Sequence, residues 1–121
     1  MEAKKWKLIY KRVRLSSDVL EDFKDKDIAR LWYEGKRVKR LPPYLGEEKL
    51  IRVLQILNSI SHPLKLKEFL PPKSKVRQIK WGKEKGKWKL NLDSQFRVRF
   101  IWKEDTKKII WLEVGEFHDE K

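Results

Sequence analysis

The sequence predicts an α+β fold, in which two helices from the first half of the chain pack on one face of a small, mainly antiparallel sheet formed by the second half. Two observations predict it. Apolar residues recur every three or four positions in the first half, which is the spacing of a helix, whereas apolar and polar residues alternate in the second half, as in a strand. We expect the two helices to form a hairpin over one face of the sheet.

Length and composition indicate one domain. A chain of 121 residues can bury a single modest core. The absence of cysteine excludes disulfides and thiolate metal sites and favours an intracellular protein. No apolar run approaches the roughly 20 residues that span a bilayer, and the basic start lacks the apolar core of a signal peptide. We therefore expect a soluble, cytoplasmic protein.

Residues 1–18 are predicted to form a basic N-terminal extension, and residues 19–121 the folded domain. In the extension, Trp6, Leu8 and Tyr10 occupy alternate positions. That pattern suits either an edge strand or a mobile basic arm, and the sequence leaves the two open.

The first helix is predicted to follow a short strand at residues 19–23. Asp25 or Asp27 can cap its start, and Gly35 tolerates the left-handed conformation that often ends a helix. Between these ends, the apolar stripe falls at Ile28, Leu31 and Trp32.

The second helix is predicted to begin at Glu47 and to end near residues 58–61, because His62-Pro63 disfavours its continuation. Acidic residues at its start suit the helix dipole. Residues 63–72 then form a connector. The apolar stripe of this helix falls at Leu50, Val53, Leu54 and Leu57.

Four strands are predicted in the second half of the chain. In the second and third strands, apolar side chains fall on one face and cations on the other. A turn at residues 103–107 gives the last strand room to pair back antiparallel. The sheet therefore presents an apolar face for a core and a basic face for a partner. The strands are expected at residues 76–80, 88–92, 96–102 and 109–114.

Charge is the strongest global signal. The chain holds 31 Lys+Arg against 18 Asp+Glu, a net charge of +13. Residues 73–89 contain eight of these cations and a single acid, Glu84. Such a surplus predicts a polyanionic partner, first of all a nucleic acid, and the alternative is a merely solvated surface.

Several short motifs occur in a fixed order along residues 19–118. Together they resemble the HigB-type toxins of the RelE/ParE superfamily, the plasmid maintenance killer proteins. The resemblance implies a RelE-like fold and the toxin of a type II toxin–antitoxin system. The motifs are Phe23-Lys24-Asp25-Lys26, residues 31–35, Leu41-Pro42-Pro43, Leu70-Pro71-Pro72, residues 82–90, residues 95–100 and Gly115-Glu116-Phe117-His118.

The resemblance further implies a ribosome-dependent mRNA endonuclease, or mRNA interferase, that needs no metal. In such enzymes the substrate's 2′-OH attacks the adjacent phosphate and leaves a cyclic phosphate and a 5′-OH. The reaction requires a base, an acid and cations for the charge on the phosphorane. By the resemblance, His118 is the acid/base and Arg97 holds the scissile phosphate. Lys80 supports the phosphate, one position away from the family's lysine, and Glu116 orients or assists.

The tail departs from the family pattern, which is usually Asp-Tyr-His. Phe117 lacks the phenol of the tyrosine, but its ring can still stack on a base. Trp81 and Trp88 flank the basic turn and are further candidates for stacking. The RNA contacts expected from the basic turn, the strands and the tail are Lys83, Lys85, Lys87, Lys89, Arg99 and Phe117.

The expected partners follow from the resemblance. They are the ribosome with its mRNA and a cognate HigA-like antitoxin with a helix-turn-helix, through which alone the toxin would meet operator DNA. No membrane partner, metal or cofactor is expected, and the two histidines have no ligand-like spacing. Two alternatives stay open: a non-catalytic RNA- or ribosome-binding module on the same fold, favoured by Phe117, and a gyrase-directed toxin of the ParE branch, against which the histidine tail argues.

Overall fold

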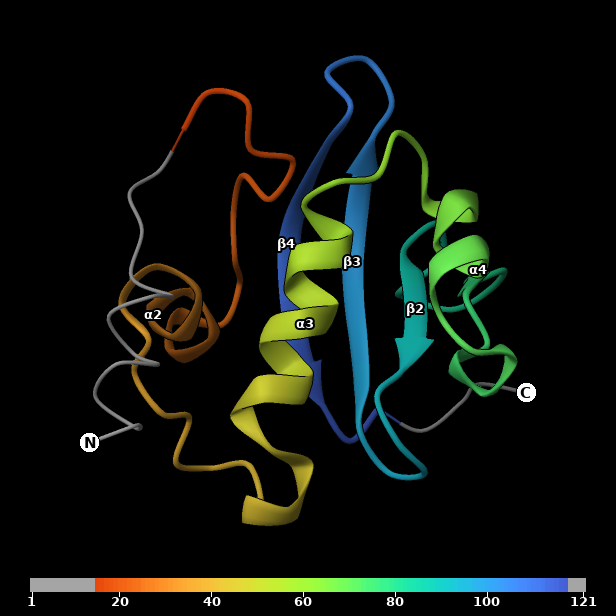
Figure 1. Cartoon of the computed structure of the whole chain (residues 1–121). Helices are drawn as coiled ribbons and strands as arrows, with labels where there is room; N and C mark the ends of the chain where they lie inside the picture. Colours follow the sequence, from red (N-terminus) through yellow and green to blue (C-terminus); the bar gives the residue numbers. More distant parts are fainter. Residues whose placement is uncertain (1–14, 118–121) are drawn as a thin grey trace.

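The computed structural model describes residues 15–117 of the chain (Figure 1). Residues 1–14 of the predicted N-terminal extension, for which an edge strand and a basic arm were both left open, and the tail residue His118 lie outside this range. Within it, three helices precede a sheet, and the connections include 3-10 turns at Pro43–Leu45, Pro63–Lys65 and Pro72–Ser74. The helices and strands are α2 (Lys26–Glu34), α3 (Glu47–Leu57), α4 (Leu66–Phe69), β1 (Arg77–Gln78), β2 (Trp88–Asn91), β3 (Arg97–Lys103) and β4 (Lys108–Gly115).

The α+β prediction is confirmed. The strands form one antiparallel sheet in the order β1-β2-β3-β4. The bounds predicted for β2, β3 and β4 agree with the structure to within one residue at each end. β1 is shorter than predicted, because only Arg77 and Gln78 pair with β2.

Residues 19–23 do not form the continuous strand that was predicted. The segment runs beside β4 in the parallel direction and meets it at two isolated bridges. Trp111 lies between the two contact points on β4 and has a φ of 60°, which is incompatible with a regular ladder. The bridges join Leu20 to Ile109 and Phe23 to Leu112.

α2 begins and ends where the sequence predicts, and its C-cap Gly35 has a left-handed φ of 70°. Asp25 stands at the N-cap but makes no side-chain capping bond. Its Oδ2 accepts instead from the Val114 N–H and from Arg40, both at 2.8 Å. Asp25 therefore fastens the start of α2 to the end of β4.

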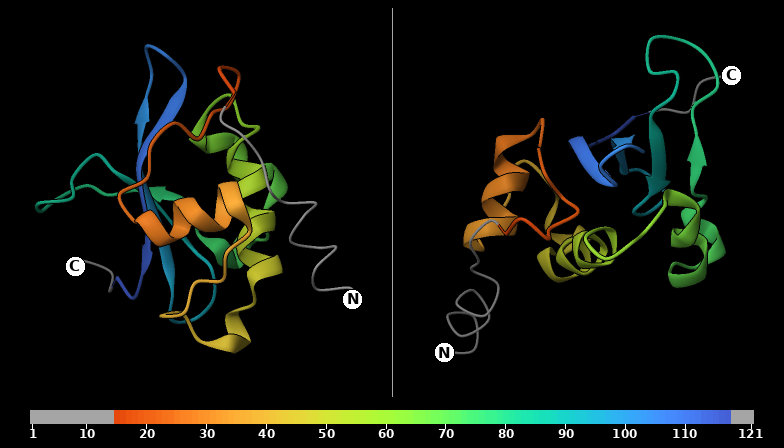
Figure 2. Two further views of the ribbon diagram at one scale, coloured as in Figure 1. Left: turned by 90° about the vertical axis from the view of Figure 1, so that its left-hand side faces the viewer. Right: turned by 90° about the horizontal axis from the view of Figure 1, so that it is seen from above.

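The predicted helical hairpin on one face of the sheet is not confirmed. α3 crosses that face, whereas α2 lies beside the β4 edge and runs in a different direction (Figures 1 and 2). The reason is that residues 19–25 bind along β4 and so carry α2 to the edge of the sheet.

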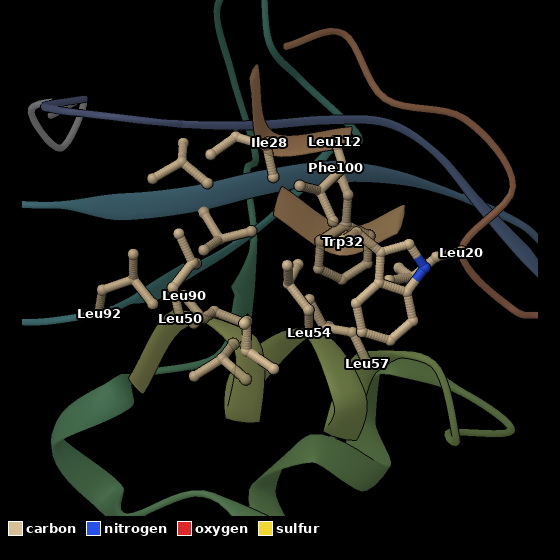
Figure 3. Packing of buried hydrophobic residues seen from close by; sticks show 14 of the residues in the cluster. Leu20, Ile28, Trp32, Leu50, Leu54, Leu57, Leu90, Leu92, Phe100 and Leu112 are labelled. Atoms are coloured by element: carbon tan, nitrogen blue, oxygen red, sulfur yellow. The ribbon is translucent and has the colours of Figure 1, made fainter. Parts of the chain in front are cut away.

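One hydrophobic core joins both helices to the sheet. Figure 3 shows the leucines of α3 facing side chains of the strands, with Trp32 of α2 closing one side of the cluster. Burial of this apolar surface is the main stabilising term of such a domain. The fully buried members include Leu20, Ile28, Trp32, Leu50, Leu54, Leu57, Leu90, Phe100 and Leu112.

The connector at residues 63–72 contains a one-turn helix, α4, that the sequence did not predict. Leu66 anchors it in the core. α4 and α3 flank β2 on the same side of the sheet (Figure 1). Over residues 15–117, none of the helices is both long and apolar enough to cross a membrane.

Candidate nucleic-acid interface

The sheet has two chemically different faces. Val98 and Phe100 of β3 are buried toward α3, and Arg97 and Arg99 alternate with them on the opposite side, which we call the outer face. The alternation predicted from the sequence is thus confirmed for this strand. In Figure 2 (left), the loop between β1 and β2 projects from the sheet away from the helices.

A row of charged residues crosses the outer face, one from each strand. Arg77 pairs with Lys89, Lys89 with Arg99, and Arg99 with Glu113 in the strand register. Like charges in directly opposed positions repel one another. Glu113 is the one acid in this row, and it partly offsets that repulsion.

Glu113 is the centre of the outer face. Its side chain is only 3% exposed, and each of its oxygens accepts from a cation. Lys24 donates to Oε1 at 3.0 Å, while Nε and Nη2 of Arg99 donate to Oε2 at 3.0 and 2.9 Å. A carboxylate so far removed from water requires such partners. The pairing fixes the position of the Arg99 guanidinium.

Phe117 covers Arg99 from the other side. Its ring centroid lies 3.7 Å from the Arg99 guanidinium carbon, a stacked cation–π contact. Gly115 makes this fold-back possible, because a Cβ at that position would lie 2.9 Å from the Phe117 ring. The tail is therefore brought onto the outer face by a residue without a side chain.

The other predicted residues of β3 and the tail have different partners. Arg97 donates from Nη1 to the Asp93 and Phe96 carbonyls, at 3.0 and 3.2 Å. Glu116 accepts at 2.7 Å from Gln95, whose own side-chain oxygen accepts from Tyr44 at 2.8 Å. Glu116 is therefore held at the turn between β2 and β3, and Phe117 rather than Glu116 is brought to Arg99.

The predicted lysines divide into two groups. Lys80, Lys83 and Lys85 are exposed on the projecting loop between β1 and β2. Lys87 is half-buried and ion-paired with Glu84, and Lys89 is only 4% exposed within the sheet. The loop lysines can thus contact a large anion directly, whereas Lys89 contributes its charge from below the surface.

Trp111 is an aromatic residue of the outer face that the sequence analysis did not single out. It is 39% exposed, and the ammonium groups of Lys87 and Lys24 lie 5.2 and 5.5 Å from its ring centroid. Its positive φ coincides with an irregularity of the β3–β4 register between Arg99 and Ile101. The bulge thus places an indole beside the Glu113 cluster.

Electrostatics connect the loop to this cluster. The hydrogen bond from Lys87 lowers the pKa of Glu84, burial raises it, and the charges of Arg99, Lys87 and Lys24 lower it further. The net effect is a pKa below 4.5. Glu84 therefore stays ionised near neutral pH as the partner of Lys87 in the loop.

Two aromatic candidates have distinct environments. Trp88 is buried, and its ring meets that of His62 edge to face at 5.9 Å, while His62 also contacts Trp102 at 6.0 Å. Trp81 is exposed on the projecting loop. Of the two tryptophans at the basic turn, Trp81 is thus the one available for stacking.

Sequence reasoning missed Lys24, Trp111 and Glu113. The last two were read as members of one apolar run, although Glu113 is its single acid. A lone carboxylate inside a strand opposite an arginine strand is a signal of a cross-strand pair. Lys24 carries no such signal, because its contact depends on how residues 19–24 dock against β4.

The outer face can hold an anion but contains little acid–base chemistry of its own. Cations in fixed positions bind phosphate groups, and the exposed indole and the Phe117 ring offer aromatic surface. These features extend over β1 to β4 and end at the tail. The arrangement is therefore that of a polyanion-binding surface.

Comparison with known families gives one match. A family model described as a RelE-like toxin of the type II toxin–antitoxin system HigB matches residues 21–114. No curated protein matches the chain. The matched segment contains both helices flanking the core, all four strands except the last residue of β4, and the Lys24–Glu113–Arg99 cluster.

Proposed function

Because the chain belongs to the HigB-like family of RelE-like toxins, and so is the toxin of a type II toxin–antitoxin pair with a cognate antitoxin, we propose that it is a ribosome-dependent mRNA endonuclease. The observation that carries the proposal is the position of Arg99. Its guanidinium is fixed by Glu113 and stacked by Phe117, the residue that directly precedes His118.

In the proposed reaction, the 2′-oxygen of a nucleotide forms a bond to the adjacent phosphorus, and the bond from phosphorus to the 5′-oxygen breaks. The proton of the 2′-OH leaves to a base, and a proton is delivered to the 5′-oxygen, so that a cyclic phosphate and a 5′-OH result. His118 acts as the acid/base, since an imidazole titrates near neutral pH. Arg97 and Lys80 neutralise the phosphorane, and Glu116 assists through its place in the tail.

The remaining cations bind RNA without reading its sequence. Lys83 and Lys85, on the exposed loop, contact phosphates of ribosomal or messenger RNA. Arg99, held in position by Glu113 and Phe117, contacts a phosphate, and Lys87 and Lys89 add positive potential to the same surface. Phe117 can stack on a base with the ring face that does not cover Arg99.

The partners of the proposed enzyme follow from this assignment. The antitoxin is HigA-like with a helix-turn-helix, and any contact with operator DNA runs through the antitoxin complex. The substrate is mRNA on the ribosome, which places the protein in the cytoplasm. The net charge of +13 suits such a site of action.

The first test is induced expression of wild type and His118→Ala, with the 5′ ends of cellular mRNA mapped within minutes. We expect in-frame cuts in translated messages that disappear in the variant. Arg97→Ala should reduce cleavage by about 100-fold, whereas Arg30→Ala, an exposed arginine on α2, should not change it. Undiminished cleavage by His118→Ala would refute the assigned chemistry.

A second candidate function is a non-catalytic ribosome-binding module, favoured by the phenylalanine in place of the family tyrosine. The stacked ring of Phe117 supports it, because a phenyl group can stabilise binding but cannot donate a proton. Phe117→Tyr distinguishes the two candidates. If no cuts arise from either wild type or this variant while ribosome co-sedimentation persists, the binding module is the better assignment.

A further inference from the structure

A groove of about 680 Å³ begins between α3 and the segment after α4 and extends past the turn between β2 and β3 to Arg97 of the outer face. One wall is α3, the other is the segment from Phe69 to Lys75, and the turn between β2 and β3 lines its end. Figure 1 shows the backbone segments that carry its lining residues: α3, the segment after α4 and the end of β2. Of its lining residues, only Arg97 has a role in the functions discussed above.

The groove is strongly cationic. Lys49 and Arg52 line it from α3, and Lys73 and Lys75 from the opposite wall. The one acid in its lining is Asp93, whose Oδ1 already accepts from the Gln95 and Phe96 backbone amides at 2.8 and 2.7 Å. An anionic occupant would therefore meet cations on both sides.

The groove is also apolar along its length. Val53 and Ile56 line it from α3, one helical turn after Lys49 and Arg52. Val53 is 8% exposed at the margin of the core, and Ile56 is partly buried against the core. Leu92 lines the end near the sheet, and Phe69 is 61% exposed on the opposite wall. An exposed phenylalanine beside aliphatic side chains is typical of a protein-binding groove.

We infer that this groove binds an acidic, amphipathic segment of the antitoxin, with its apolar side chains against Val53, Ile56 and Phe69 and its carboxylates between the lysines and arginine of the two walls. The inference rests on the family assignment, which implies an antitoxin, and not on the nuclease activity. The apolar side chains between the cations favour an amphipathic peptide over RNA, because an RNA backbone would engage the cations and leave the aliphatic side chains without a partner.

The groove also suggests how binding would silence the toxin. Arg97 lines the end of the groove, and Asn91 lies beside it. A carboxylate of the bound segment that reaches Arg97 competes directly with the phosphate that this arginine is proposed to hold. The antitoxin then blocks the reaction from the helical side, without covering the loop lysines.

The test measures binding of two labelled probes by fluorescence anisotropy. One is a peptide as long as α3 with leucines at helical spacing and glutamates elsewhere, and the other is single-stranded oligouridine. Arg52→Glu/Lys73→Glu reverses one exposed cation on each wall. The matched control, Arg30→Glu/Lys39→Glu, reverses two exposed cations outside the groove lining.

We expect the groove variant to weaken peptide binding by about tenfold or more, and the control variant to leave it nearly unchanged. Phe69→Ala, which changes no charge, should weaken it several-fold. Equal losses in both double variants, equal binding of a scrambled peptide, or an unchanged affinity in Phe69→Ala would overturn the inference.

If the groove variant lost oligouridine binding but retained peptide binding, the groove would be assigned to RNA, and the inference of an antitoxin segment would be overturned. Circular dichroism checks that each variant is folded. If the charge-reversal variants do not fold, the binding measured with Phe69→Ala decides the test. Because the readout is peptide binding rather than RNA cleavage, it succeeds or fails independently of the nuclease proposal.

Discussion

Arg99 is held between Glu113, whose Oε2 accepts from its Nη2 at 2.9 Å, and Phe117, whose ring centroid lies 3.7 Å from its guanidinium carbon. The carboxylate fixes the guanidinium in its plane, and the ring covers one face of it. An arginine constrained in this way loses little conformational entropy when it binds a phosphate.

Gly115→Ala is expected to displace the Phe117 ring from Arg99. The added methyl carbon would lie 2.9 Å from the ring, which is too close, and the atoms that it meets belong to the side chain of Phe117 rather than to the backbone. Nuclear magnetic resonance should show the Arg99 side-chain protons losing the ring-current shift that Phe117 produces. Phe117→Ala provides the reference spectrum without a ring. A spectrum unchanged by Gly115→Ala would mean that the tail does not fold back in solution.

Glu113→Ala is expected to lower the free energy of unfolding by about 3 kcal/mol, because it leaves Arg99 and Lys24 without their shared carboxylate. Urea denaturation measures the change. Glu104→Ala is the control, since its partner Lys107 lies in the exposed turn between β3 and β4. Equal losses in the two variants would contradict a special role for the buried carboxylate.

Asn58→Ala should destabilise the fold by about 1–2 kcal/mol, because its side-chain oxygen accepts from the Val19 and Leu20 amides at 2.8 and 2.9 Å. The same residue thus ends α3 and anchors the segment beside β4. The midpoint of thermal unfolding measures this loss, and Ser59→Ala, which changes an exposed neighbour, is the control. A midpoint no lower than that of Ser59→Ala would show the anchor to be dispensable.

Trp111→Gly is expected to be more stable than Trp111→Ala by about 1 kcal/mol. Both variants lose the indole and its contacts with the lysines, but only glycine adopts a φ of 60° without steric cost. Chemical denaturation of the pair measures the difference. The reverse order of stability would indicate that the bulge relaxes once the indole is removed.

Lys87→Met is expected to raise the pKa of Glu84 toward 4.5, because the hydrogen bond that contributes most to lowering it is lost. A carboxyl whose pKa is lower in the folded than in the unfolded protein stabilises the fold above its unfolded pKa. That stability is lost as the pH falls through the folded pKa. In the wild type, the ionised Glu84 should therefore stabilise the fold down to a lower pH, because its pKa in the folded protein is lower than in the variant. A carbon-detected titration of the Glu84 carboxyl checks the direction, and Lys85→Met, an exposed neighbour, should leave it unchanged.

The candidate site was predicted in part. The alternation of Arg97 and Arg99 with apolar residues located the outer face, because a strand turns successive side chains to opposite sides. The partners of these arginines were not predictable from local pattern. Glu113 and Lys24 are 89 residues apart, and the pair forms only because residues 19–24 dock along β4.

By itself the sequence determined the elements and their chemistry. Local periodicity and end signals placed α2, α3 and the three longer strands, and the alternation of β3 gave one apolar and one cationic face. The tertiary structure decided what those elements do together: α2 at the β4 edge instead of in a hairpin, the bulge at Trp111, the Glu113 cluster and the cationic groove. These features join segments distant in the chain, so their geometry follows from packing and strand register rather than from the preference of any one segment.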